Sequence, residues 1–116
     1  MNFADLLQPL LTVPGAVAAA FYDPQGQSIA EAGDHEAVEA LGAYHSIWLS
    51  ALEETSSRSG LGPVEELAID FAGRRALTAT VGGRYYLVVV FDPWAQVSLV
   101  RPRIALVRDR LAAEIG

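Results

Sequence analysis

Two short apolar runs constrain the fold of this chain more than any other feature of its sequence. The runs Gly15–Tyr22 and Tyr85–Phe91 are apolar at both odd and even positions, and Pro- and Gly-containing turn signals bound them. Each is far shorter than the roughly 20 residues that span a bilayer. A short run of this kind is typical of a strand whose two faces are both covered. We therefore expect two interior strands with helices on both sides of the sheet.

The remaining segments supply those helices and the other strands. Apolar residues at helical spacing predict three helices, and alternation between turn signals predicts three further strands. The expected elements are a helix over 3–13, strands over 15–22 and 27–32, a helix over 34–57, strands over 64–71, 76–81 and 84–91, and a final helix from 98. This order, α-β-β-α-β-β-β-α, predicts a three-layer α/β (α+β) domain over residues 1–116: a five-stranded antiparallel sheet with helices on both faces.

Polar residues and glycines mark the expected helix ends. Asn2, Asp34 and Ser98 are candidate N-caps, and Gly60 closes the long central helix. The serines just before Gly60 are expected in a turn-like segment, without a neighbouring base to activate them.

The central helix over 34–57 has an unusually wide apolar face. A helix that packs on one sheet needs an apolar stripe little more than 100° wide, whereas this one covers about 200° at 100° per residue. Val38, His45 and Leu49 form one flank; Tyr44 and Ile47 lie toward the other. Either another segment of the same chain covers the second flank, or a partner does. The first and last helices are needed on the opposite sheet face, so we expect a partner, most simply a second copy.

The strand over 64–71 points to the same surface. It alternates where its neighbours are uniformly apolar, so we expect it at an edge of the sheet, open to pairing with another chain. Glu65 and Glu66 could instead blunt that edge at one end. The predicted dimer or partner interface combines the helix flank with this edge and comprises Ala40, Tyr44, Ile47, Trp48, Ala51, Leu67, Ile69 and Phe71.

Composition and charge narrow the classes of partner. Hydrophobic residues make up 52% and charged residues 19% of the 116 residues, which predicts an apolar surface patch beyond the core. The net charge of −6 argues against nucleic acid, which needs a basic surface. The chain has no cysteine and its N-terminus lacks a basic region followed by an apolar one. We expect a cytoplasmic protein without membrane insertion.

No catalytic, metal or cofactor constellation stands out. The sequence contains no phosphate-binding P-loop and no dinucleotide fingerprint. His35 is expected to be exposed, and His45 to be a packed side chain and not a metal ligand. Arg74, Arg75 and Arg84 lie at strand turns, where an arginine that stabilises phosphoryl transfer is conceivable but plain surface is commoner. We expect a protein that is not an enzyme and needs no cofactor.

Several motifs together resemble the roadblock family, the dynein light-chain type that also occurs in bacterial regulators of gliding motility and cell polarity. Val13–Val17 (VPGAV) and Asp23–Ala30 (DPQGQSIA) resemble the start of that domain, and Gly83–Phe91 with Ser98–Arg101 resemble its end. Pro9 and Pro102 depart from the family pattern inside the flanking helices.

The resemblance implies the same element order and a homodimer formed through the third strand and second helix. It also implies binding to a small Ras-like GTPase in signalling, in some members accelerating GTP hydrolysis by repositioning the GTPase's own residues. Two alternatives remain open. One is a small-molecule sensor with a cavity beside Ala18–Ala20, and the other is an adaptor in a larger assembly without a GTPase.

Overall fold

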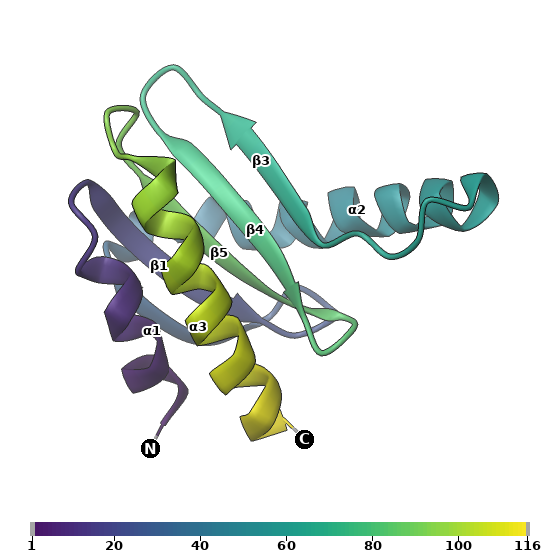
Figure 1. Cartoon of the computed structure of the whole chain (residues 1–116), viewed down its shortest axis with the longest axis horizontal. Coiled ribbons are helices and arrows are strands. Elements are labelled where there is room, and N and C mark those ends of the chain that lie inside the picture. The colour runs from purple at the N-terminus through teal and green to yellow at the C-terminus, as the bar shows by residue number, and fades with distance from the viewer. Residues whose placement is uncertain (1, 116) are drawn as a thin grey trace.

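The structure, a computed structural model, describes residues 2–115, apart from the side chains of Ala40 and Ala43. The chain forms three layers, with α1 and α3 on one face of a five-stranded sheet and α2 on the other (Figure 1). The elements are α1 Phe3–Leu11, β1 Ala16–Tyr22, β2 Ser28–Gly33, α2 His35–Ser59, β3 Glu66–Asp70, β4 Arg75–Val81, β5 Tyr85–Phe91 and α3 Val97–Ile115. The expected order and fold class are confirmed.

The two apolar runs are interior strands. The sheet order is β2-β1-β5-β4-β3 with every pair antiparallel, so β1 and β5 lie side by side near its centre. Ala19 lies opposite Val89 in their register, and both are fully buried. β3 is at one edge, as its alternating pattern predicts. The short runs are therefore apolar on both faces because helices cover both faces.

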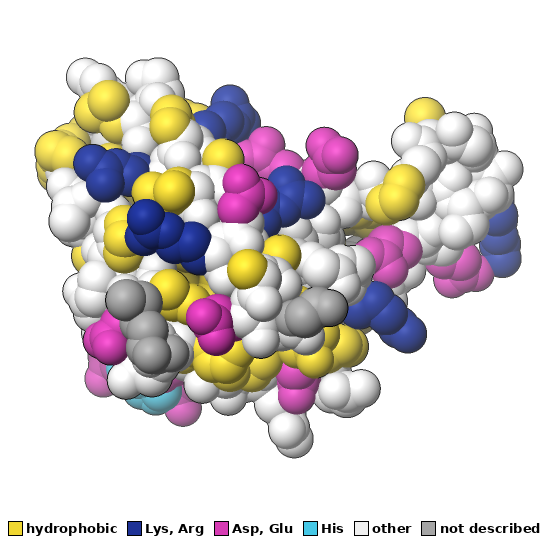
Figure 2. Space-filling view, turned by 60° about the horizontal axis from the view of Figure 1, so that its bottom comes forward, with side chains coloured by type: hydrophobic (Ala, Val, Ile, Leu, Met, Phe, Trp, Pro, Cys, Tyr) yellow, Lys and Arg dark blue, Asp and Glu magenta, His cyan; other side chains and the backbone are white. Residues whose placement is uncertain are grey.

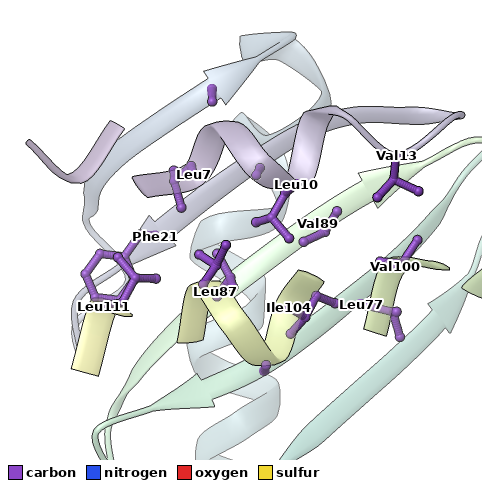
Figure 3. Packing of buried hydrophobic residues seen from close by; sticks show 14 of the residues in the cluster. Leu7, Leu10, Val13, Phe21, Leu77, Leu87, Val89, Val100, Ile104 and Leu111 are labelled. Carbon is purple, nitrogen blue, oxygen red and sulfur yellow. The ribbon is translucent and has the colours of Figure 1, made fainter. Parts of the chain in front are cut away.

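The larger part of the core lies between the sheet and the pair α1 and α3. Figure 3 shows leucines of α1 pointing toward the sheet, where Phe21, Leu87 and Val89 meet them. α3 packs on the same face, with Val100, Ile104, Val107 and Leu111 buried. Because α1 and α3 both pack on this face, neither of them covers α2 on the other face (Figure 1).

The helix ends follow local chemistry, with two exceptions. The Asn2 and Asp34 side chains accept hydrogen bonds from the backbone N–H of Asp5 and Glu36, as N-caps do. Ser98, however, is the second residue of α3, which begins at Val97 after a turn, so the predicted N-cap is wrong. The predicted turn containing the serines is also wrong, because α2 continues through Ser59 and ends at Gly60 in the left-handed region, φ +72°.

The other face of the sheet holds α2 through two tyrosines. The Tyr22 hydroxyl donates to the Val38 carbonyl at 2.9 Å, and the Tyr86 hydroxyl donates to the Gly42 carbonyl at 2.7 Å. A Cβ at Gly42 would lie 2.4 Å from the Tyr22 ring, so the helix and the sheet can approach this closely only at a glycine. The first half of α2 is thereby fixed over β1 and β5.

Candidate interaction surface

One flank of α2 is packed on the sheet and the other is open to solvent. Val38, His45 and Leu49 are buried against β1 and β5. Tyr44 and Ile47 lie on the other side of the helix and remain 57% and 63% exposed. In the part of the chain that the structure describes, no third layer shields them, so the apolar excess noted in the sequence is a real exposed surface.

Trp48 connects the packed flank to the open one. Its ring is half-buried and lies 6.0 Å from the Tyr44 ring and 5.0 Å from the His45 ring, measured between centroids. Ala51 lies one turn further along and is exposed. Ala40 is on the same helix, but its side chain lies outside what the structure describes. The described members of the predicted helix surface thus form one continuous aromatic and aliphatic strip.

The edge strand β3 presents the second half of the predicted surface. Leu67 and Ile69 pair in register with Thr78 and Ala76 of β4 and are half-buried on the α2 side of the sheet, whereas Glu66, Ala68 and Asp70 are exposed. Phe71 lies just beyond the strand and is also exposed. We refer to Tyr44, Ile47, Trp48, Ala51, Leu67, Ile69 and Phe71 as the α2–β3 face.

Of the two glutamates that could blunt this edge, Glu66 is directed away from it. Glu66 accepts a hydrogen bond from Arg101 of α3 at 3.2 Å, which draws its side chain to the opposite face of the sheet. The Glu65 carbonyl accepts from the Thr80 N–H within the β3–β4 pair. The outer edge of β3 therefore keeps backbone groups that a further strand can pair with.

Burial governs the titration of the groups beneath α2. His45 is fully buried, and desolvation lowers its pKa although its Nδ1 lies 2.8 Å from the Leu41 carbonyl. Its Nε2 has no hydrogen-bond partner in the described structure. Desolvation also raises the pKa of Tyr86 to about 12. These groups are structural, since they lie inside the core that holds the helix in place.

The arginines that follow β3 and β4 differ in their engagement. Arg74 forms an ion pair with Asp92, which follows β5, at 3.1 Å. Arg75 pairs with Asp70, and this contact raises the arginine's pKa and lowers the carboxylate's. Arg84 is exposed in the β4–β5 turn.

His35 and the alanines of β1 lie in different environments, one exposed and the other buried. His35 is exposed at the start of α2, and its Nδ1 contacts Glu31. Ala18, Ala19 and Ala20 are fully buried: Ala18 and Ala20 lie in the cluster with Tyr22 and Tyr86 under α2, and Ala19 lies in the core on the α1 and α3 side. Among residues 2–115, no three His, Cys, Asp or Glu side chains gather as a metal site would require, and no helix has the length and apolarity to cross a membrane.

Comparisons with known proteins place this fold. A search of curated proteins gave no match. A Roadblock/LC7 domain from Streptomyces avermitilis superposes with a TM-score of 0.88 at 17% identity, covering 99% of this chain and 98% of that one. Myxococcus xanthus MglB superposes with a TM-score of 0.82 at 24% identity, covering 96% and 82% of the two chains. A structure described as MglB with tetrameric arrangement gives 0.84 at 20% identity, covering 96% and 85%.

At these identities the superpositions establish the fold, and the sequence establishes the family. The family model for the Roadblock/LC7 domain matches residues 2–91, from α1 to the end of β5, which is more than three quarters of the chain. The resemblance drawn from the VPGAV, DPQGQSIA and RYYLVVVF segments is thus confirmed, and the chain belongs to the Roadblock/LC7 domain family.

Proposed function

We propose that this protein is a non-catalytic regulator or scaffold that forms a homodimer and binds a small Ras-like GTPase. The observation that supports this most is the α2–β3 face, where exposed aromatic and aliphatic side chains adjoin an unpaired strand edge. Such a surface costs free energy in water and is stabilised when a partner covers it.

A second copy is the simplest partner for this face. Two β3 edges related by a two-fold axis pair antiparallel, and the same rotation brings the two α2 strips together on one side of the joined sheets. Both halves of the surface are then satisfied by one interface. The similar MglB described with a tetrameric arrangement supports self-association in this fold.

The GTPase part of the proposal rests on family membership and on the sequence resemblance to bacterial gliding and polarity regulators. With such a partner, the proposed site of action is the cytoplasm and the proposed role is in signalling. Where members of the family accelerate hydrolysis, the resemblance implies that they reposition the GTPase's own residues. Arg74 and Arg75 are less suited to insertion into a GTPase, because each would have to leave an aspartate.

Two measurements test the proposal together. Sedimentation equilibrium of the purified chain at micromolar concentration is expected to give twice the 12.4 kDa chain mass. The Ras-like GTPases of the source organism, loaded with GDP or a non-hydrolysable GTP analogue, are expected to bind the chain in a nucleotide-dependent way. A monomeric mass would refute the proposed homodimer. Binding that is absent, or equal in both nucleotide states, would refute the proposed GTPase partner.

Matched variants assign the surface. Tyr44→Asp and Ile47→Asp place a charge in the α2–β3 face and are expected to give monomers that keep their circular dichroism spectrum. Leu106→Asp is the control, because Leu106 is 41% exposed but lies on α3, on the opposite side of the sheet. A Tyr44→Asp, Ile47→Asp double variant that remains dimeric would show that another surface is used. Pull-down from cell extract with identification of the bound proteins separates the GTPase reading from the adaptor reading.

A further inference from the structure

A shallow apolar groove lies at the beginning of α2. It has a volume of about 450 Å³ and opens between the first turns of the helix, β4, β5 and the β3–β4 turn. Ala37 and Leu41 form its helix side, Ala76 and Val90 its floor, and Phe71 its far wall. It is continuous with the α2–β3 face through Phe71, so a partner seated on that face would cover it.

Just beyond the opposite end of α2, the apolar side chain of Leu61 is exposed to solvent. The C-terminal turns of α2 and the segment that follows them extend beyond the sheet as an arm (Figures 1 and 2). At its tip Leu61 is 79% exposed, the largest exposed fraction among the large hydrophobic residues described. The tip is nevertheless held in place, since the backbone N–H groups of Gly60 and Leu61 both donate to the Ser56 carbonyl, at 3.0 and 3.3 Å.

We propose that Leu61 of each copy inserts into the groove of the other copy, so that the dimer is clasped at both ends. This inference rests on the homodimer proposed above and adds a specific contact to it. A two-fold axis through Ile47, the most exposed large hydrophobic residue of α2, sets two α2 helices antiparallel, with position 47+n of one beside position 47−n of the other. Leu61 is then about 20 Å from the axis at 1.5 Å per residue, level with the first residues of the partner helix.

Charge complementarity supports the same register. Arg58 in the last turn of α2 and Glu36 in its first turn are exposed and lie eleven positions either side of Ile47. Within its own helix Arg58 also pairs with Glu54 at 2.7 Å, so the partner's glutamate would join an existing ion pair. At 100° per residue, Arg58 and Glu36 each lie about 20° from Ile47 around the helix, on the flank that would face the partner. In an antiparallel pair centred on Ile47, each arginine meets the partner's glutamate, one residue from Ala37 in the groove wall.

Site-directed cross-linking tests the contact directly, because the chain has no cysteine of its own. Leu61→Cys and Gly73→Cys variants are mixed and treated with a short bis-maleimide. Gly73 borders the groove and tolerates the change, since an added Cβ would have no atom within 4 Å. We expect a covalent heterodimer from this mixture. A mixture of Leu61→Cys with Leu106→Cys, on the far side of the sheet, is the control and should remain uncross-linked beyond background.

Two further variants separate this contact from dimerisation itself. In the Ile47→Cys variant, the cysteines of the two copies should cross-link to each other near the two-fold axis. This product shows that the dimer has formed. Dimeric protein that cross-links through Ile47→Cys but not between Leu61→Cys and Gly73→Cys would overturn the clasp and leave the dimer standing. A monomer that cross-links at neither place would overturn both.

The affinity gives a second readout. Leu61→Ala is expected to weaken dimerisation roughly tenfold or more, because the leucine is desolvated only in the dimer and occurs twice in it. Its thermal unfolding as a monomer should be unchanged, since the side chain contacts almost nothing within its own copy. Dimer dissociation equal to that of the unsubstituted protein would contradict the clasp.

Discussion

Replacing Ile47 by alanine should weaken the dimer strongly and the folded monomer only slightly. The change deletes three carbons, worth about 2.4 kcal/mol at about 0.8 kcal/mol per buried methylene. Ile47 is 63% exposed in the single chain. Roughly 1.5 kcal/mol of that free energy of burial is therefore gained only on dimerisation. Because the two-fold axis places two copies of Ile47 in the interface, the dimer gains about 3 kcal/mol. The remainder, below about 1 kcal/mol, acts on the monomer.

A loss of about 3 kcal/mol corresponds to a roughly hundredfold higher dimer dissociation constant. Sedimentation equilibrium over a dilution series measures that constant, and urea unfolding of the diluted monomer measures the smaller effect on folding. Leu106→Ala, a comparable deletion on α3, should leave dimerisation unchanged. The reasoning would be refuted if Ile47→Ala and Leu106→Ala had the same dissociation constant as the unsubstituted protein.

Two further predictions concern how α2 is held on the sheet. Gly42→Ala should lower the free energy of unfolding by about 1–3 kcal/mol in denaturant melts, because its Cβ would lie 2.4 Å from the Tyr22 ring; Gly73→Ala, with free space around its Cβ, should change it by less than about 0.5 kcal/mol. Burial lowers the pKa of His45 in the folded chain below that in the unfolded chain, which is about 6.5. The neutral buried histidine is therefore fully compatible with folding above that pH, and the free energy of unfolding falls as the pH drops from there toward the folded pKa. Urea melts between about pH 7.5 and 5 should show a smaller acid-induced loss for His45→Gln than for the unsubstituted chain; equal losses would exclude His45 as the source.

The fold could be predicted from sequence because its strongest signals were local. The uniformly apolar β1 and β5 and the alternating β3 identified interior and edge strands before any pairing was known. The prediction for Ser98 is wrong because the helix begins one residue earlier: the Gln96 carbonyl already accepts from the Leu99 and Val100 N–H groups, so Ser98 lies within the first turn. The serines before Gly60 were assigned to a turn because serine favours turns, yet within α2 three of the last residues donate their hydroxyls back to helix carbonyls.

The candidate surface was only partly accessible to sequence reasoning. The helical period identified Tyr44 and Ile47 as the flank that the sheet leaves open, and the structure places both in solvent. The groove beside Phe71 could not be foreseen, because its walls come from α2, β4, β5 and a turn that are distant along the chain. Nor could the sequence show that α2 outruns the sheet, which depends on the crossing point fixed by Gly42 and Tyr22.

The central claim is that a second copy covers the exposed flank of α2, and the reactivity of a single thiol at position 47 tests it most directly. Ile47→Cys is labelled with a maleimide dye over a range of protein concentrations, with Leu106→Cys as reference. The account predicts that labelling at position 47 slows as the concentration rises through the dimer dissociation constant, while labelling at position 106 does not. Labelling at position 47 that is equally fast at every concentration would contradict it.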